Sequence, residues 1–152
     1  MFLNLNALRR MKMASFKANG IDDLCNAMAK VQNVPDNIIR NMLQAMGEVA
    51  KRAIESSAKA KGVVGTGLTI ASIKLKRPKI TPTGGQTAVT FGGSRTRANT
   101  TTRNAEIAFI NEFGKRGQPA RPFIKDAIDK EGAKIGDAGT EIFNKWLETN
   151  GL

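Results

Sequence analysis

The feature that most constrains this fold is a long amphipathic segment over residues 36–61. Pro35 stands near its first turn, where the missing N–H of proline costs nothing, and Gly62 follows its last turn, where glycine commonly ends a helix. Its apolar side chains recur three and four positions apart, as on one face of an α-helix: Ile39, Met42, Met46, Val49 and Ala53. The pattern predicts one long helix with a Met-rich face in the core.

A second amphipathic segment begins at Pro122, which suits a first helical turn. Its apolar positions again follow helical spacing: Phe123, Ile124, Ala127, Ile128, Ile135, Ile142, Phe143, Trp146 and Leu147. Three glycines each weaken such a helix by up to about 1 kcal/mol relative to alanine: Gly132, Gly136 and Gly139. The segment predicts a long terminal helix in which the glycines allow close packing or a bend.

The chain between these helices is predicted to be mainly strand. Residues 73–80 alternate apolar and basic side chains, and residues 86–93 are rich in Thr, Val and Phe. Residues 105–113 also alternate and predict a further strand, whereas the polar residues 94–103 predict a long loop. We therefore expect an α+β fold, in which a mainly antiparallel sheet of three to four strands from 72–113 packs against a long central helix and a long C-terminal helix.

The length of 152 residues suggests a single domain with an ordinary core. Residues 1–14 are predicted to be an N-terminal extension or arm, and residues 15–152 a single α+β domain. At the start of that domain, residues 15–20 are a weak strand candidate, and residues 21–31 predict a short helix.

Charge is distributed unevenly along the chain, whose net charge is +11. Residues 74–121 hold ten Lys and Arg against two Asp and Glu, whereas residues 122–152 hold four against six. A basic middle third of this kind often contacts a polyanion, usually nucleic acid. A merely soluble basic surface explains the same charge equally well.

The sequence lacks the residue types that several catalytic and metal-binding sites require. There is no histidine, which removes His-based triads and His metal sites, and one cysteine cannot form a disulfide or a thiolate zinc site. That cysteine, Cys25, lies in a helical pattern and is interpreted as a structural thiol. "GVVGTGLT" does not fit a phosphate loop, because Leu68 and Thr69 follow its last glycine and the required Lys is missing. No run reaches the length of a membrane span, and no secretory signal is recognised. No enzyme activity, metal or cofactor is expected.

One carboxylate pair keeps an enzymatic alternative open. Glu106 and Glu112 are six residues apart, so on the predicted strand they share one face. A small hydrolase with two catalytic carboxylates is conceivable from this spacing. A solvated face, or an ion pair to a neighbouring basic strand, is the simpler explanation.

The stretch "NEFGKRGQPARPF" reads as a structural corner. Gly114 can take backbone conformations closed to other residues, and Pro119 and Pro122 push their preceding residues toward extended geometry. Together these residues predict a strand, a loop and the start of the terminal helix. Arg121 is predicted to pair with Glu112 across the loop.

This corner resembles the signature segment of a tailed-bacteriophage head–tail joining family, the small neck, minor tail or tail-completion proteins of long-tailed phages. That family has an aromatic strand ending in Glu-Phe-Gly, a variable loop, and Ala-Arg-Pro-Phe at the start of the last helix. The matching residues here are Glu112, Phe113, Gly114, Ala120, Arg121, Pro122 and Phe123. Phe109 stands where the family often has Tyr, and the arginine-rich loop 94–103 and the prefix are departures.

A second stretch, "TGLTIASI", resembles the family's Thr-Gly-x-Leu-x-x-Ser-Ile motif after its long helix. Ile70 lies one place late in this pattern, and Leu68 one place early. The matched residues are Thr66, Gly67, Leu68, Ser72 and Ile73. With a weaker match in "FKANGIDDL", the resemblance covers about residues 15–130 in the same order.

The resemblance implies a structural virion protein without catalytic activity. Such proteins look like components of a homo-oligomeric ring, expected here to be a hexamer, between the portal side of a DNA-filled head and the tail. The implied partners are other copies of the chain, neck, portal-side and tail-terminator proteins, and the genomic DNA in the channel, with no membrane; assembly would occur in the host cytoplasm. Candidate contacts to DNA or partners are Arg95, Arg97, Arg103, Lys115 and Arg116. A basic nucleic-acid-binding module outside the virion is the alternative.

Overall fold

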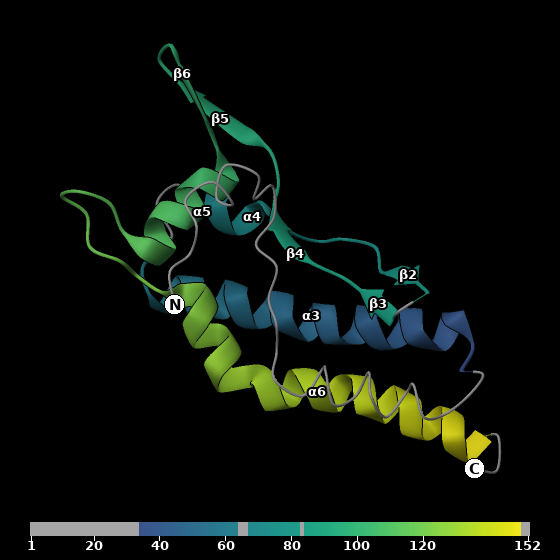
Figure 1. The fold of residues 1–152 in the computed structure, drawn as a ribbon. Helices are drawn as coiled ribbons and strands as arrows, with labels where there is room; N and C mark the ends of the chain where they lie inside the picture. Colours follow the sequence, from purple (N-terminus) through teal and green to yellow (C-terminus); the bar gives the residue numbers. More distant parts are fainter. Residues whose placement is uncertain (1–33, 64–66, 83, 150–152) are drawn as a thin grey trace.

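Two long helices form the base of the molecule. The structure is a computed structural model, and it describes residues 34–63, 67–82 and 84–149. Helix α3 (Asp36–Ala60) and helix α6 (Phe123–Thr149) lie side by side and run in opposite directions (Figure 1). Both helices were predicted, and both are confirmed.

The core lies between these helices and the first strands. On α3, Met42 and Met46 of the predicted stripe are buried, but Ile39, Val49 and Ala53 are only half-buried, and the buried face continues instead through Leu43, Ala50 and Ile54. Helix α6 contributes Phe123, Ala127, Ile135 and Phe143 to the same interior. Apolar side chains at helical spacing thus bury one face of each helix, which is the main stabilising effect in a fold of this size.

The strands pair two by two. Strand β1 (Ile73–Leu75) pairs with β4 (Val89–Phe91), and β2 (Lys79–Thr81) pairs with β3 (Gly84–Gln86), both antiparallel. These four short strands follow one another as a long irregular hairpin over residues 73–91, here named the first hairpin. Its apolar face packs on α3, where Gly47 leaves room for Leu75, since a Cβ there would lie 2.4 Å from a Leu75 methyl carbon.

A second hairpin stands where the sequence predicted a loop. Strands β5 (Ser94–Arg97) and β6 (Thr100–Arg103) pair antiparallel and project away from the helices (Figure 1). The loop prediction for residues 94–103 was therefore wrong. Neither face of this hairpin is buried, so its sequence carries no apolar alternation to reveal it. Its strand-forming signal is the Thr-rich composition, with Thr96 and Thr101 paired across the strands at 2.9 Å.

The third predicted strand is a helix. Residues Asn104–Phe113 form α5, which follows β6 directly, and a single helical turn, α4 (Leu68–Ala71), lies beside it (Figure 1). The α+β class with antiparallel strands is confirmed, but the strand predicted at 105–113 was wrong. The predictions for residues 1–31 lie outside the described residues.

Candidate functional site

Helix α5 is amphipathic in an unusual sense. Its buried stripe consists of Asn104, Ala108 and Glu112, spaced four residues apart on one face. A second stripe, about 100° around the helix, carries Phe109 and Phe113, of which 39% and 61% of the surface is exposed. The small and polar side chains therefore face the protein, and the aromatic ones face outward.

Glu112 is buried because it caps the last helix. Its two carboxylate oxygens accept hydrogen bonds from the backbone N–H groups of Ile124 and Lys125, at 2.8 and 2.9 Å. These are N–H groups that the first turn of α6 cannot satisfy internally, and a negative charge is favourable at that end of a helix. The carboxylate thus fixes α5 to the start of α6.

Arg121 ties the same corner to α3, not to Glu112 as predicted. Its backbone N–H donates to the carbonyl of Asn111 at 2.6 Å, and its guanidinium Nη1 donates to the carbonyl of Gly62 at 3.1 Å. The prediction of an ion pair with Glu112 was wrong, because the backbone of α6 occupies both carboxylate oxygens. The corner, residues 112–123, is therefore held from both sides.

An ion pair adds a further link between α3 and α6. The Lys61 Nζ lies 2.5 Å from a carboxylate oxygen of Asp126. The hydrogen bond from this ammonium lowers the pKa of Asp126 below its ordinary value of 3.8. A hydrogen bond with Asp129 likewise raises the pKa of Lys125 above its ordinary value. Both pairs lie at the surface of the first turns of α6.

The turn of the corner depends on Gly114. This residue has a φ of 78°, and an added Cβ would lie 2.9 Å from both the Gln118 carbonyl oxygen and the Ala120 nitrogen. The loop then closes on itself, with reciprocal backbone hydrogen bonds between Lys115 and Gln118. The predicted corner is therefore real, although it joins a helix to a helix.

The remaining corner residues divide between core and surface. Phe123 is fully buried and meets Phe91 of β4 edge to face, with ring centroids 6.0 Å apart. Ala120 is exposed and Pro122 half-buried. Of the seven corner residues that carry the family resemblance, Glu112, Gly114, Arg121 and Phe123 have structural roles.

The second motif forms the entry to the first hairpin. Gly67, with a φ of 76°, precedes α4, while Ser72 ends it and donates its hydroxyl to the Thr69 carbonyl at 2.7 Å. Ile73 is buried in the core, whereas half of the Leu68 surface is exposed. Thr66 lies outside the described residues.

Leu68, Phe109 and Phe113 are the large apolar side chains that the described surface exposes. Helices α4 and α5, which carry them, are neighbours, and the rings of Phe109 and Phe113 lie 4.7 Å apart. We call these three residues the apolar patch. Exposed apolar rings next to one another, such as those of Phe109 and Phe113, are typical of protein contact sites. The strand prediction did not reveal this face. Phe109 and Phe113 are four residues apart, and that spacing makes them neighbours on the surface of a helix.

The five predicted basic contacts do not behave alike. Arg95 points inward: its Nη2 donates to the Thr69 hydroxyl at 2.6 Å and its Nε to Asn104 at 3.2 Å. It fixes the base of the second hairpin, a role that the sequence did not predict. Arg97 and Arg103 are exposed on that hairpin.

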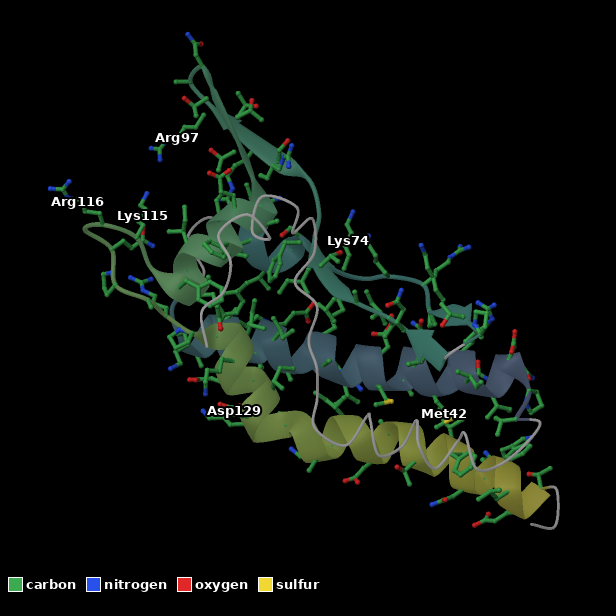
Figure 2. All side chains as sticks on the ribbon, in the orientation of Figure 1. Met42, Lys74, Arg97, Lys115, Arg116 and Asp129 are labelled. Atoms are coloured by element: carbon green, nitrogen blue, oxygen red, sulfur yellow. The ribbon has the colours of Figure 1, made fainter. Side chains whose placement is uncertain are left out.

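Lys115 and Arg116 are exposed on the corner loop. Figure 2 shows these two residues and Arg97 reaching outward at the end of the molecule that α5 occupies. Three of the predicted contacts therefore project at one end of the molecule. No acidic side chain forms an ion pair with them within the described segments.

The two carboxylates of the hydrolase alternative are not brought together. On a helix, residues six apart face different directions, and Glu106 is exposed while Glu112 is buried. Across residues 34–63, 67–82 and 84–149, no group of three or more His, Cys, Asp or Glu side chains could hold a metal ion. In the same ranges, no helix is both long and apolar enough to cross a bilayer.

Comparisons with protein families, curated proteins and solved structures find no match to this chain. The candidate site therefore rests on its own geometry: a rigid corner, the exposed aromatic pair of α5 that leads into it, and basic side chains that project at the same end of the molecule.

Proposed function

We propose that this chain is a structural virion protein of a phage neck, which joins a DNA-filled head to a tail as part of a ring around the DNA channel. The observation that carries the proposal is the corner. The residues that resemble the head–tail joining family build one closed unit, with Glu112 on the α6 N-terminus, Arg121 on the end of α3, and Phe123 in the core. Their roles are architectural, as expected of a scaffold protein.

The apolar patch supports contacts with other subunits. Phe109 and Phe113 lie on α5, which the corner holds firmly against the rest of the protein, and Leu68 lies on the neighbouring helix α4. Aromatic residues are enriched in protein interfaces, where a rigid ring contributes apolar area at low entropic cost. We assign this patch to a neighbouring copy in a homo-oligomeric ring, with six-fold symmetry as the expected arrangement.

The projecting cations support contacts at the ends of such a ring. Arg97 and Arg103 stand on the second hairpin, and Lys115 and Arg116 on the corner loop (Figure 2). Exposed Arg and Lys attract acidic protein surfaces or phosphates over about a Debye length, roughly 8 Å at physiological salt. Neighbouring neck, portal-side or tail-terminator proteins, and DNA in the channel, are the partners that these groups suit.

Electron microscopy of lysates tests this function directly. A phage with a disrupted copy of this gene is expected to yield DNA-filled heads and separate tails, which purified protein rejoins. Joined, normal particles from the disrupted phage would refute the proposal. The matched control is a phage carrying a wild-type copy in trans, which must restore joined particles.

A second candidate, a nucleic-acid-binding module outside the virion, is favoured by the charge alone. Residues 56–105 contain nine Lys and Arg and no Asp or Glu. The mass of the purified protein discriminates the two candidates: a monomer that binds nucleic acid at all tested concentrations favours the module, and a ring favours the neck component.

A further inference from the structure

The first hairpin carries a basic surface that the predicted contacts do not include. Four of its residues within six positions are cations: Lys74, Lys76, Arg77 and Lys79, all exposed. They lie within residues 56–105, a segment that contains no Asp or Glu. The four residues are named here the cationic ridge.

Strand alternation sets the direction of the ridge. Ile73 is buried and Leu75 half-buried against α3, so Lys74 and Lys76 extend from the opposite face. Ile80 likewise turns toward the α3 side chains near Gly85 and leaves its neighbour Lys79 exposed. Figure 2 shows Lys74 rising from the hairpin on the side away from α6. The lysines therefore share the outer face.

The backbone holds the ridge without help from its charged groups. Lys74 lies opposite Thr90 in the β1–β4 ladder, and the Thr90 hydroxyl donates to its carbonyl at 3.4 Å. The Lys76 N–H donates to Ala88, and the Lys76 carbonyl accepts from the Thr87 hydroxyl at 2.7 Å. These bonds use main-chain atoms of the lysines, so their ammonium groups can change without disturbing the hairpin.

The ammonium and guanidinium groups of the ridge form no ion pair with a carboxylate of the described residues. Throughout the described residues, the ion pairs involve Lys51, Lys61, Lys125 and Lys134, and none involves the ridge. Four like charges close together repel one another unless an anion lies nearby. A polyanion is therefore the natural occupant of this surface.

The character of the outer face identifies which polyanion fits. The residue opposite Lys79 is the exposed, polar Gln86, whereas Thr90, opposite Lys74, is polar but buried. A protein contact would require an apolar centre, and lysine is depleted in such contacts. A single strand would require aromatic stacking, and the exposed aromatic residues of the described surface lie on α5. A duplex backbone requires only cations and hydroxyl or amide groups.

We propose that the cationic ridge binds the phosphate backbone of double-stranded DNA without sequence preference. The five steps from Lys74 to Lys79 span at most about 17 Å of extended chain, along which duplex DNA carries about ten negative charges. The ridge thus meets several phosphates at once. This inference rests on the proposed function for the origin of the DNA, namely the genome in the channel, but the binding itself is a property of the purified chain.

Fluorescence anisotropy with a labelled mixed-sequence duplex, measured between about 50 and 200 mM salt, tests the proposal. Over this range, proteins with many phosphate contacts typically lose affinity by ~10³–10⁵-fold. The variant is Lys74→Gln, Lys76→Gln and Lys79→Gln together. The matched control is Lys130→Gln, Lys134→Gln and Lys145→Gln on α6, which removes the same charge from exposed positions. The ridge variant is expected to bind more weakly, with a log–log salt slope shallower by about 2.7. The control is expected to keep the wild-type slope.

Four results would overturn the inference. They are no duplex binding by the wild-type chain, unchanged binding by the ridge variant, an equal loss in both variants, and tighter binding to single strands than to the duplex. Circular dichroism on all three proteins confirms that each is folded.

The electron-microscopy test of the disrupted phage, combined with the binding assay, distinguishes failure of the ridge proposal from failure of the neck function. Separate heads and tails in the disrupted phage, together with a ridge variant that still binds DNA, refute the ridge alone. Normal particles from the disrupted phage, together with loss of binding by the ridge variant, refute the neck function alone.

Discussion

The two sides of helix α5 reverse the usual distribution of residues. Glu112 is 6% exposed, and the next residue, Phe113, is 61% exposed. Carboxylates are almost never buried unless paired, whereas large aromatic side chains usually are buried. The two neighbours thus differ tenfold in exposure, in the direction opposite to their hydrophobicity.

Backbone hydrogen bonding explains the inner side. Asn104 donates from its side chain to the Gly92 carbonyl at 2.8 Å, and Glu112 accepts from two N–H groups of α6. Both ends of the buried stripe satisfy main-chain groups that no regular element satisfies. The exposed side chains Phe109 and Phe113 make no hydrogen bonds to main-chain groups, so this aromatic pair is available to a partner. Burial in α5 therefore marks what builds the fold, and exposure marks what remains for contact.

The largest effect should come from the inner end of the corner. Phe123→Ala removes a fully buried ring in contact with Phe91 and should lower the free energy of unfolding by about 3–5 kcal/mol. Urea unfolding followed by circular dichroism measures the change. Phe113→Ala, the same substitution on the outer side, should change it by less than about 0.5 kcal/mol. Equal losses of unfolding free energy in the two variants would contradict the difference in burial between Phe123 and Phe113.

Glu112→Gln should have the next largest effect. The substitution keeps the shape of the side chain but replaces one acceptor oxygen with an amide NH₂ that faces a backbone N–H. We expect a loss of about 1–3 kcal/mol, the cost of a buried donor left unsatisfied. Glu106→Gln on the same helix is the control, because that carboxylate is exposed. If both variants unfold at the same urea concentration, Glu112 does not hold α6.

A pair of glycines tests the geometry of the corner itself. Gly114 and Gly117 have φ values of 78° and 79°, but only at Gly114 would a Cβ meet backbone atoms at 2.9 Å. Alanine at either position incurs strain of about 1–3 kcal/mol, and at Gly114 the steric clash adds to it. Thermal melts should therefore show Gly114→Ala well below Gly117→Ala. The reverse order would contradict the close packing of residues 114–120.

The sequence was sufficient for elements whose burial follows a simple period. Helices α3 and α6 show apolar stripes at 3.6-residue spacing, so both were predicted within a few residues of their ends. The corner followed from Gly114 and Pro122, whose backbone restrictions are local properties of the chain.

Helix α5 was not predictable in this way, because its buried stripe is polar or small. Asn104, Ala108 and Glu112 carry no hydrophobic period, and the alternation of Ile107, Phe109 and neighbouring residues imitates a strand. The partners of Glu112 and Arg95 come from distant parts of the chain and depend on tertiary contacts. Local sequence rules cannot supply such pairings.

A smaller, pH-dependent effect is expected at Asp126. Lys61 lowers the pKa of this carboxyl below 3.8, so the folded state favours the charged form. The resulting stabilisation is present above the ordinary pKa and is lost as the pH falls through the lower value of the folded protein. The melting temperature of wild type should exceed that of Asp126→Asn at neutral pH, and the difference should shrink in acid. Asp137→Asn is the control, and a pH-independent difference would contradict the pairing.

The smallest effect on stability is expected from replacing the exposed aromatic pair of α5. This replacement is also expected to have the clearest effect on assembly. Phe109→Ser with Phe113→Ser removes two exposed rings in tilted contact with each other, so the free energy of unfolding should move by no more than about 0.5–1 kcal/mol. Multi-angle light scattering should nevertheless show a shift toward monomer, because the proposed apolar contact between copies would be lost. Glu106→Gln, also exposed on α5, should leave the mass distribution unchanged. A double serine variant that assembles like wild type would show that α5 exposes its aromatic pair for some purpose other than contact between copies.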